Sequence, residues 1–233
     1  MTNPYSDLLG FIGVTRHPGG LKATEELLNK CEIKTDSYVL DIGCGVGRTS
    51  CYLAKKYGCK VIGIDISKNL VGIAKERAKK EDLLNIVEFK HSDVRKLPFN
   101  SEEFDIVISE SVTSLSNDKN LFLNEYKRVT KIGGYIGLNE VTWINGTYDT
   151  RFSNVLYTIG GIYPETSDNW IKLLKQIELK NISSQTNKLS VFKQIEYNGL
   201  IDVLKSVIML LKLSVYKQEF RFINKNLEKN FMK

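Results

Sequence analysis

The chain has 233 residues, of which 42% are hydrophobic and 26% are charged, values typical of soluble globular proteins. This balance excludes an intrinsically disordered chain and a protein with several membrane spans. The net charge of +6 and the pI near 9.0 would suit nucleic acid, but the lysines are scattered or gathered in the tail. We therefore do not expect a nucleic-acid partner.

Residues 1–37 are predicted to form a turn-rich arm that leads into a helix from about Leu21 to Lys30. An arm placed before the first strand of an α/β sheet can fold over the carboxyl ends of the strands. The stretch Met1–Gly10 lacks the basic start and apolar run of a secretory signal. We therefore expect a cytoplasmic location.

Short apolar runs alternate with helical patterns between residues 38 and 142. The runs are YVLDI, KVIGID, NIVEFK, FDIVIS and YIGLNEV, and the helical patterns cover Arg48–Tyr57, Lys68–Lys80 and Lys119–Thr130. Such alternation is typical of parallel strands joined by crossover helices. It predicts an α/β, Rossmann-like, doubly wound and mostly parallel sheet with helices on both faces. The length suits a single domain, 1–233, with residues 38–142 as its core.

The pattern loosens in residues 143–233, which we expect to supply a lid, the remaining sheet and a C-terminal helix. Trp143–Pro164 is rich in aromatic residues and glycine, a helical pattern covers Asn169–Ile177, and Leu179–Gln185 has the composition of a strand. The apolar helical pattern Gly199–Tyr216 is too short and too interrupted by charges to span a bilayer. It could rest on a membrane surface, although packing on the core or lid is the commoner role of such a helix.

The strongest local signal is DIGCGVG at residues 41–47, directly between a strand and a helix. Glycines at such a junction let the backbone pass close to a ligand, beside the positive end of the helix dipole. A dinucleotide fingerprint, G-x-G-x-x-G, would need glycine where Arg48 stands, so the third glycine comes one residue early. Asp65 ends the next strand 20 residues after Gly45, where a carboxylate can accept both ribose hydroxyls. These features favour a nucleoside ligand without a pyrophosphate.

The four cysteines are Cys31, Cys44, Cys51 and Cys59, and they contain no C-x-x-C pair. Because the chain has two histidines to supplement them, a zinc site has poor support and we expect no metal. Buried or half-buried free thiols are the simplest interpretation.

Four motifs in chain order resemble those of the class I S-adenosylmethionine-dependent methyltransferases, over roughly residues 10–142. VLDIGCGVGRTS is similar to the family's first motif, and VIGIDIS is similar to its ribose-binding strand end. HSDVRKLPFNSEEFDIVISES resembles the stretch with the adenine-binding aspartate and the fourth strand, and RVTKIGGYIGLNE resembles the turn and strand that follow. The order and the LPF segment look most like the branch that methylates quinones, sterols and other small molecules.

The resemblance implies S-adenosyl-L-methionine as methyl donor and S-adenosyl-L-homocysteine as product. The glycines would flank the methionine part, Asp65 would hold the ribose, and Asp93 would accept from the exocyclic amine of adenine. The full set of cofactor-binding residues that it implies is Asp41, Gly43, Cys44, Gly45, Gly47, Asp65, Ile66, Asp93, Val94 and Ser109. The alternative for the glycines is a plain strand-to-helix turn, and for Asp93 it is an ordinary turn aspartate.

Two features depart from the family pattern. Ile132 precedes Gly133-Gly134 where the family usually has proline, and no convincing seventh strand follows unless FRFI at 220–223 serves as one. The Asn/Asp-Pro-Pro-aromatic signature of enzymes that methylate amines of DNA bases is also absent. Glu110-Ser111-Val112-Thr113 occupies its place.

Methyl transfer from a sulfonium is an in-line displacement, so the enzyme mainly aligns the nucleophile and removes its proton where it has one. Glu110 at the end of the fourth predicted strand and His17 on the arm are the candidate catalytic residues. The alternatives are a solvated loop carboxylate and a turn histidine. We expect Glu110 to contribute to catalysis rather than to folding.

Other polar and aromatic residues near the predicted site have structural interpretations that we favour. Glu140 is expected to make a structural hydrogen bond and His91 to be buried in packing. Lid aromatics usually pack, although a set of them could line an apolar or cation-binding pocket: Trp143, Tyr148, Tyr157 and Tyr163.

The sequence thus predicts a methyltransferase that uses S-adenosyl-L-methionine and acts on a small-molecule acceptor, either lipophilic or an amine. One alternative is a protein or RNA methyltransferase, which a continuous basic groove would favour. The other is a catalytically silent cofactor-binding module that regulates a partner. No pattern predicts the acceptor or the oligomeric state.

Overall fold

The computed structural model describes residues 17, 19–143 and 161–187, all within the first of two compact units, residues 1–190. Four predicted features lie wholly or partly outside the described residues: arm residues 1–16 and 18, lid residues 144–160, the apolar pattern Gly199–Tyr216, and FRFI at 220–223. Within the described ranges, no helix is long and apolar enough to cross a membrane.

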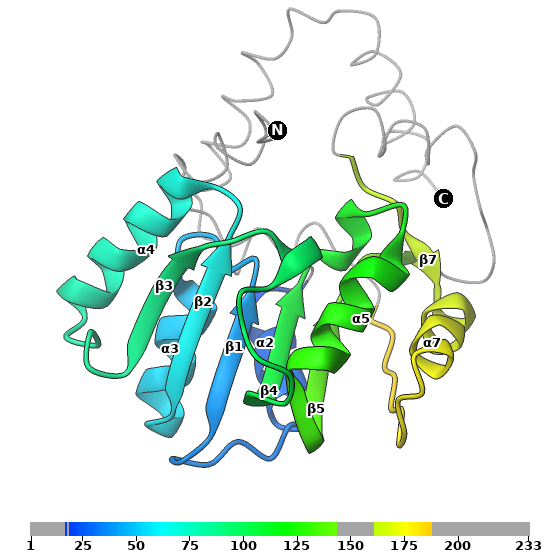
Figure 1. Ribbon diagram of the computed structural model, residues 1–233, viewed down its shortest axis with the longest axis horizontal. Coiled ribbons are helices and arrows are strands. Elements are labelled where there is room, and N and C mark those ends of the chain that lie inside the picture. Colours follow the sequence, from blue (N-terminus) through cyan, green and yellow to red (C-terminus); the bar gives the residue numbers. More distant parts are fainter. Residues whose placement is uncertain (1–16, 18, 144–160, 188–233) are drawn as a thin grey trace, which may run out of the picture. The chain divides into compact units, whose positions relative to one another are not determined.

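Five parallel strands form the central sheet in the order β3-β2-β1-β4-β5 (Figure 1). Their bounds are β1 Tyr38–Ile42, β2 Lys60–Asp65, β3 Val87–His91, β4 Phe104–Glu110 and β5 Thr130–Asn139. The chain moves outward from β1 to β3 and then returns to β4 on the other side of β1. Ligands of open α/β sheets bind beside the carboxyl ends of the strands at such a reversal. The predicted Rossmann-like parallel sheet is confirmed.

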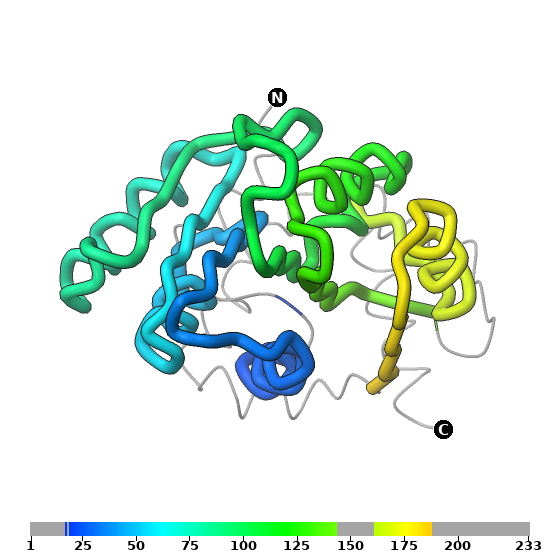
Figure 2. Tube along the Cα trace, turned by 60° about the horizontal axis from the view of Figure 1, so that its bottom comes forward, coloured from blue at the N-terminus to red at the C-terminus, as the bar shows by residue number. Residues whose placement is uncertain are grey.

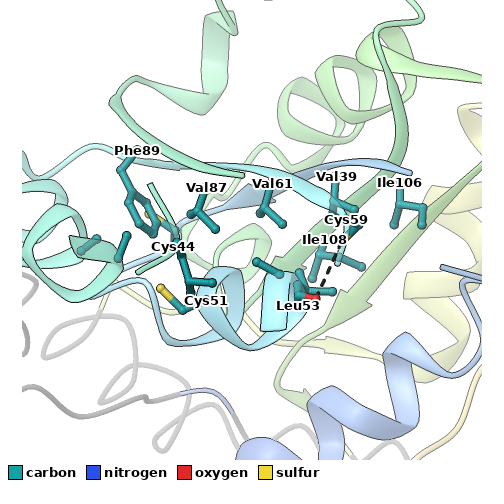
Figure 3. Close-up of a cluster of buried hydrophobic side chains, with 14 of the residues drawn as sticks. Val39, Cys44, Cys51, Leu53, Cys59, Val61, Val87, Phe89, Ile106 and Ile108 are labelled. Carbon is teal, nitrogen blue, oxygen red and sulfur yellow. Dashed lines mark hydrogen bonds between the residues drawn. The ribbon is translucent and has the colours of Figure 1, made fainter. Parts of the chain in front are cut away.

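Helices cover both faces of this sheet because successive strand residues point to opposite sides. Val39, Val61 and Ile106 pack with one set of helices (Figure 3), namely α2 Gly20–Leu28, α3 Arg48–Tyr57 and α4 Lys68–Lys80. Their neighbours Leu40, Ile62 and Val107 pack with the other set, α5 Lys119–Val129 and α7 Ser167–Gln176. Figure 2 shows α2 on the opposite side of the sheet from α5.

Local side-chain caps explain where two crossover helices begin. The Ser67 hydroxyl accepts from the Leu70 N–H at the start of α4, and the Asp118 carboxylate accepts from the Leu121 N–H at the start of α5. Both caps satisfy N–H groups that have no partner inside a helix. Two short 3₁₀ turns, η1 Val94–Lys96 and η2 Thr113–Leu115, follow β3 and β4.

The structure differs from the prediction after β4. The strand expected at Leu179–Gln185 is wrong, because Asn181 has a left-handed φ of 55° that interrupts an extended run. An unforeseen pair of two-residue parallel strands joins β6 (Thr142–Trp143) to β7 (Glu165–Thr166). A Cβ added at Gly134 in β5 would lie 2.5 Å from the Asp105 carbonyl oxygen. This position therefore requires glycine, although Ile132 replaces the proline that the family usually has before the glycine pair.

Candidate active site

The glycine loop between β1 and α3 has three left-handed residues, Gly43, Gly45 and Gly47, with φ of 71°, 54° and 77°. A Cβ on Gly43 would collide with Val112 Cγ2, and one on Gly47 would lie 2.6 Å from Phe89 Cζ. A Cβ on Gly45 would meet no atom within 4 Å. Packing therefore excludes side chains at the first and third glycines, whereas the second faces open space beside the loop.

Neighbouring elements hold this loop in place. The Cys44 N–H donates to the Ile64 carbonyl at 2.9 Å, which ties the loop to β2. Arg77 of α4 donates from Nε to the Val46 carbonyl at 2.9 Å and pairs with Glu81 at 3.3 Å. Sequence reasoning missed Arg77, since its target is a carbonyl 31 residues away that no pattern identifies.

Asp65 ends β2 with a buried carboxylate that is fixed by backbone donors. Oδ2 accepts from the Gly45 N–H at 3.0 Å, and Oδ1 accepts from the Ser67 N–H at 2.8 Å. Each carboxylate oxygen has two lone pairs, so these bonds orient Asp65 and leave it able to accept further donors such as hydroxyls. The next residue, Ile66, exposes 40% of its surface beside this carboxylate, an apolar surface suited to a flat ring.

Asp41 is buried next to the glycine loop and accepts from the Ser50 hydroxyl at 2.5 Å. Burial, with smaller contributions from the negative charges of Glu110 and Asp65, raises the pKa of Asp41 to about 7. The Cys44 thiol is also buried, and burial raises its pKa well above the ordinary value. All four cysteines are buried and free, as predicted.

Asp93 caps η1, and its carboxylate is already paired in this structure. Both of its oxygens accept from Arg95 Nε, at 3.0 and 2.9 Å, and the Arg95 N–H also donates to Oδ1 at 2.9 Å. These bonds from Arg95 lower the pKa of Asp93. Val94 is half-buried against the α5 side of the core. Adenine recognition by Asp93 stays a prediction.

The expectation that His91 is buried is wrong. The alternation of side chains along β3 places His91 on the same buried face of the sheet as Val87 and Phe89. His91 is nevertheless exposed, because it is the last residue of β3 and β3 is an edge strand. Its Nε2 lies 3.1 Å from the Ile66 carbonyl.

Glu110 lies at the centre of a polar cluster that joins four elements. Its side chain is only 6% exposed, so it is not the solvated loop carboxylate of the alternative interpretation. Oε1 accepts from the Thr24 hydroxyl of α2 at 3.0 Å and from Asn139 Nδ2 at 3.2 Å, and Oε2 accepts from the Thr49 hydroxyl of α3 at 2.9 Å. The carboxylate therefore also joins these elements to one another, and its part in catalysis stays a prediction.

His17 completes the cluster from the arm, with a buried ring that is not an ordinary turn histidine. Nε2 lies 3.2 Å from Thr24 Oγ1, while Nδ1 lies 3.2 Å from Asn139 Nδ2 and 3.4 Å from Glu110 Oε1. Because the Thr24 hydroxyl donates to Glu110, its oxygen can accept from His17 Nε2–H. Nδ1 then accepts from the Asn139 amide, so a neutral ring fits this geometry. Protonation would instead let Nδ1 donate to Glu110.

The segment after Glu110 is organised by Glu140, as predicted for a structural carboxylate. Glu140 accepts from the N–H groups of Val112, Thr113 and Ser114 at 3.1, 2.8 and 3.1 Å, and also from the Ser114 hydroxyl. Ser109 is fully buried, with its hydroxyl 3.2 Å from the Tyr126 hydroxyl, and its part in cofactor binding stays a prediction.

A separate aromatic cluster lies where β7 and α7 meet α5. The Lys119 ammonium is 3.1 Å from Glu165 and 5.8 and 5.7 Å from the ring centres of Tyr163 and Trp170. Tyr163 thus faces a cation, but one that belongs to the chain itself. Tyr148 and Tyr157 lie outside the described residues, and no group of three or more metal-ligating side chains gathers within them.

Comparisons with known proteins identify a methyltransferase domain in this chain. Residues 40–138 match the family described as "Methyltransferase domain". An uncharacterized protein of Haemophilus influenzae is 26% identical over 228 residues, 94% of this chain and 91% of that protein. A phosphoethanolamine N-methyltransferase of Plasmodium falciparum is 30% identical over 174 residues, 72% of this chain but only 62% of that enzyme. The crystal structure of the [4+2]-cyclase SpnF shares the fold, with a TM-score of 0.74 and 18% identity over 90% of this chain and 81% of that one.

Proposed function

We propose that the chain acts as a class I S-adenosylmethionine-dependent methyltransferase and transfers a methyl group from this donor to a small-molecule acceptor. The observation that carries the proposal is the pairing of Gly45 with Asp65. Gly45 leaves open space beside a left-handed backbone, and its N–H fixes a buried carboxylate at the end of the neighbouring strand. The open space beside Gly45 thus lies next to the Asp65 carboxylate, which suits the hydroxyls of a ribose.

The surrounding residues also fit the donor. Asp65 and Glu110 end two strands that flank β1, and their carboxylates suit a ligand that carries an ammonium and a sulfonium. Ile66 offers exposed apolar surface for the adenine side. When bound, the donor supplies an activated methyl group. The role of the chain is to hold the donor by its ribose and amino-acid ends and to align the nucleophile.

We place the acceptor beside the carboxyl ends of β4 and β5, where Glu110 and His17 lie. An acceptor that must lose a proton could pass it to this pair, because His17 Nδ1 lies 3.4 Å from Glu110 Oε1 and a proton taken by the ring could be donated to that oxygen. For Glu110 itself to act as base, one of its hydroxyl or amide donors would have to move away. The P. falciparum relative, named for an N-methyltransferase activity, supports an amine as acceptor. A lipophilic acceptor, peripheral membrane contact and a cytoplasmic location stay predictions.

A second candidate function is a cofactor-binding protein that does not transfer methyl groups. The structural likeness to a protein titled as a cyclase favours this second candidate, because it shows that the fold also occurs in proteins named for reactions other than methyl transfer. The two candidates differ in turnover. Incubation of the purified chain with S-adenosylmethionine and small-molecule extracts, followed by mass spectrometry, should reveal a metabolite that gains one methyl group. Donor binding without such a product would support the second candidate.

Donor binding itself is tested by calorimetry with S-adenosylhomocysteine. We expect the wild type to bind and Asp65→Ala to bind more weakly by roughly 1–3 kcal/mol, because two hydroxyls lose their acceptor. Asp105→Ala is a matched control. Asp105 also fixes a backbone N–H, that of Tyr38 at 2.8 Å, but near the start of β4 at the opposite end of the strand. Equal losses in both variants, or no binding by the wild type, would contradict the proposal.

A further inference from the structure

Ser111, the first residue after β4, combines two unusual features. Its φ of 60° is in the left-handed region, which serine seldom adopts. Its hydroxyl oxygen is buried and has no hydrogen-bond partner among the described residues. Buried hydroxyls nearly always find a partner, so a lone one at a ligand-binding edge calls for an explanation. Backbone outliers of this kind also gather at functional sites.

The contacts of Ser111 place it on the rim of the candidate active site. Its N–H donates to the Asn139 carbonyl at 2.8 Å, which continues the β4–β5 pairing by one residue. The left-handed turn then sends the next residue, Val112, back against Gly43 of the glycine loop. Ser111 therefore lies between the glycine loop and the Glu110 cluster. The packing of Val112 against Gly43 explains the turn at Ser111, but it does not explain why the residue at the turn carries a hydroxyl.

The distance across the sheet indicates which ligand group can reach this position. Asp65, the proposed ribose partner, ends β2, and β1 lies between β2 and β4. Adjacent strands are about 4.8 Å apart, so the end of β4 is about 10 Å from that of β2. The donor extends over a comparable length from its ribose hydroxyls to its amino-acid end. A donor anchored at Asp65 and running across the glycine loop would bring its amino-acid end beside Ser111.

We propose that the Ser111 hydroxyl is a binding group for the carboxylate or ammonium at the amino-acid end of the methyl donor. This inference rests on the proposed function. The hydroxyl can donate to the carboxylate or accept from the ammonium, so one serine serves either group. A hydrogen bond to the bound donor would then satisfy this hydroxyl and offset the free-energy cost of the left-handed backbone.

The test compares two ligands, S-adenosylhomocysteine and 5′-methylthioadenosine, which keeps the nucleoside and sulfur but lacks the amino-acid end. Calorimetry with Ser111→Ala should show at least fivefold weaker binding of S-adenosylhomocysteine and unchanged binding of 5′-methylthioadenosine. Ser111→Gly should show the same selective loss together with a higher melting temperature, because glycine adopts this φ without strain. Asp82→Gly is the matched control, since Asp82 has φ of 56° on an exposed turn. It should raise the melting temperature and change neither affinity.

Three results would overturn the proposal: unchanged affinity for both ligands in Ser111→Ala, equal weakening of both ligands, or a loss that Asp82→Gly reproduces. Wild-type and Asp65→Ala proteins belong in the same series. Binding by the wild type that is weakened in Asp65→Ala would uphold the donor site whatever Ser111 does, so failure of this inference and failure of the proposed function are distinguishable.

Discussion

Replacing Gly45 with alanine should separate donor binding from folding. A Cβ at Gly45 meets no atom within 4 Å, so the substitution causes no clash in the protein. The left-handed φ of 54° makes alanine cost about 1–2 kcal/mol of stability. For a chain of this size that corresponds to a drop of roughly 2–8 °C in melting temperature. The new methyl group would fill the open space where we place the donor, so calorimetry should show S-adenosylhomocysteine binding weakened more than tenfold, or at least about 1.4 kcal/mol.

Two other glycines calibrate that measurement. Gly133, with φ of 80° and no atom near an added Cβ, lies toward the amino end of β5, so Gly133→Ala should lose similar stability but keep its donor affinity. Gly43→Ala adds a collision with Val112 to the backbone strain and should lose roughly 2–5 kcal/mol of stability. Normal donor affinity in Gly45→Ala would refute the reasoning, because the space beside Gly45 would then not be the donor's.

Two carboxylates give further predictions. Glu110→Gln presents an amide to three hydrogen-bond donors, so chemical denaturation should show a free energy of unfolding lower by about 1–3 kcal/mol. Turnover should fall by roughly 10²–10⁴-fold if the carboxylate takes a proton. Full stability with normal turnover would exclude both roles. Asp41, with its pKa raised from 3.8 to about 7, stabilises the fold in its protonated form, a contribution present below about pH 4 and lost as the pH rises through 7. Wild-type stability should therefore fall by roughly 3 kcal/mol more than that of Asp41→Asn between pH 4 and 7. Parallel curves in denaturation series would contradict the cause assigned to the shift.

Much of the fold could be predicted because its signals are local. Helices α3 and α4 have the predicted bounds, since an apolar face, a serine cap and flanking glycines all lie within one stretch of sequence. The buried strands were equally clear, because runs such as YVLDI are apolar on both faces. The glycine loop was found by its spacing from Asp65, which the Gly45 N–H bond to that carboxylate now accounts for physically.

The rest depends on contacts between distant residues or on exposure at an edge. His91 has the alternation of a buried residue, but its place at the end of an edge strand is decided by the sheet order. The parallel pairing of β6 with β7 joins Thr142 to Glu165, and two-residue strands carry no periodic signal. The burial of Glu110 likewise depends on Thr24, Thr49 and Asn139, none of which is close to it in sequence.

The Glu110 cluster has a consequence for how the site is assembled. Thr49 is the second residue of the helix that follows the glycine loop, and Thr24 and His17 come from the arm and its helix. One carboxylate thus receives bonds from the donor side through Thr49 and from the arm through Thr24. A shift of α3 on donor binding would move the Glu110 carboxylate, because Thr49 bonds to its Oε2 while the arm is held through Oε1. The polar surface offered to the acceptor therefore depends on the arm being in place, and truncation before Thr24 should alter the donor site as well as the acceptor side.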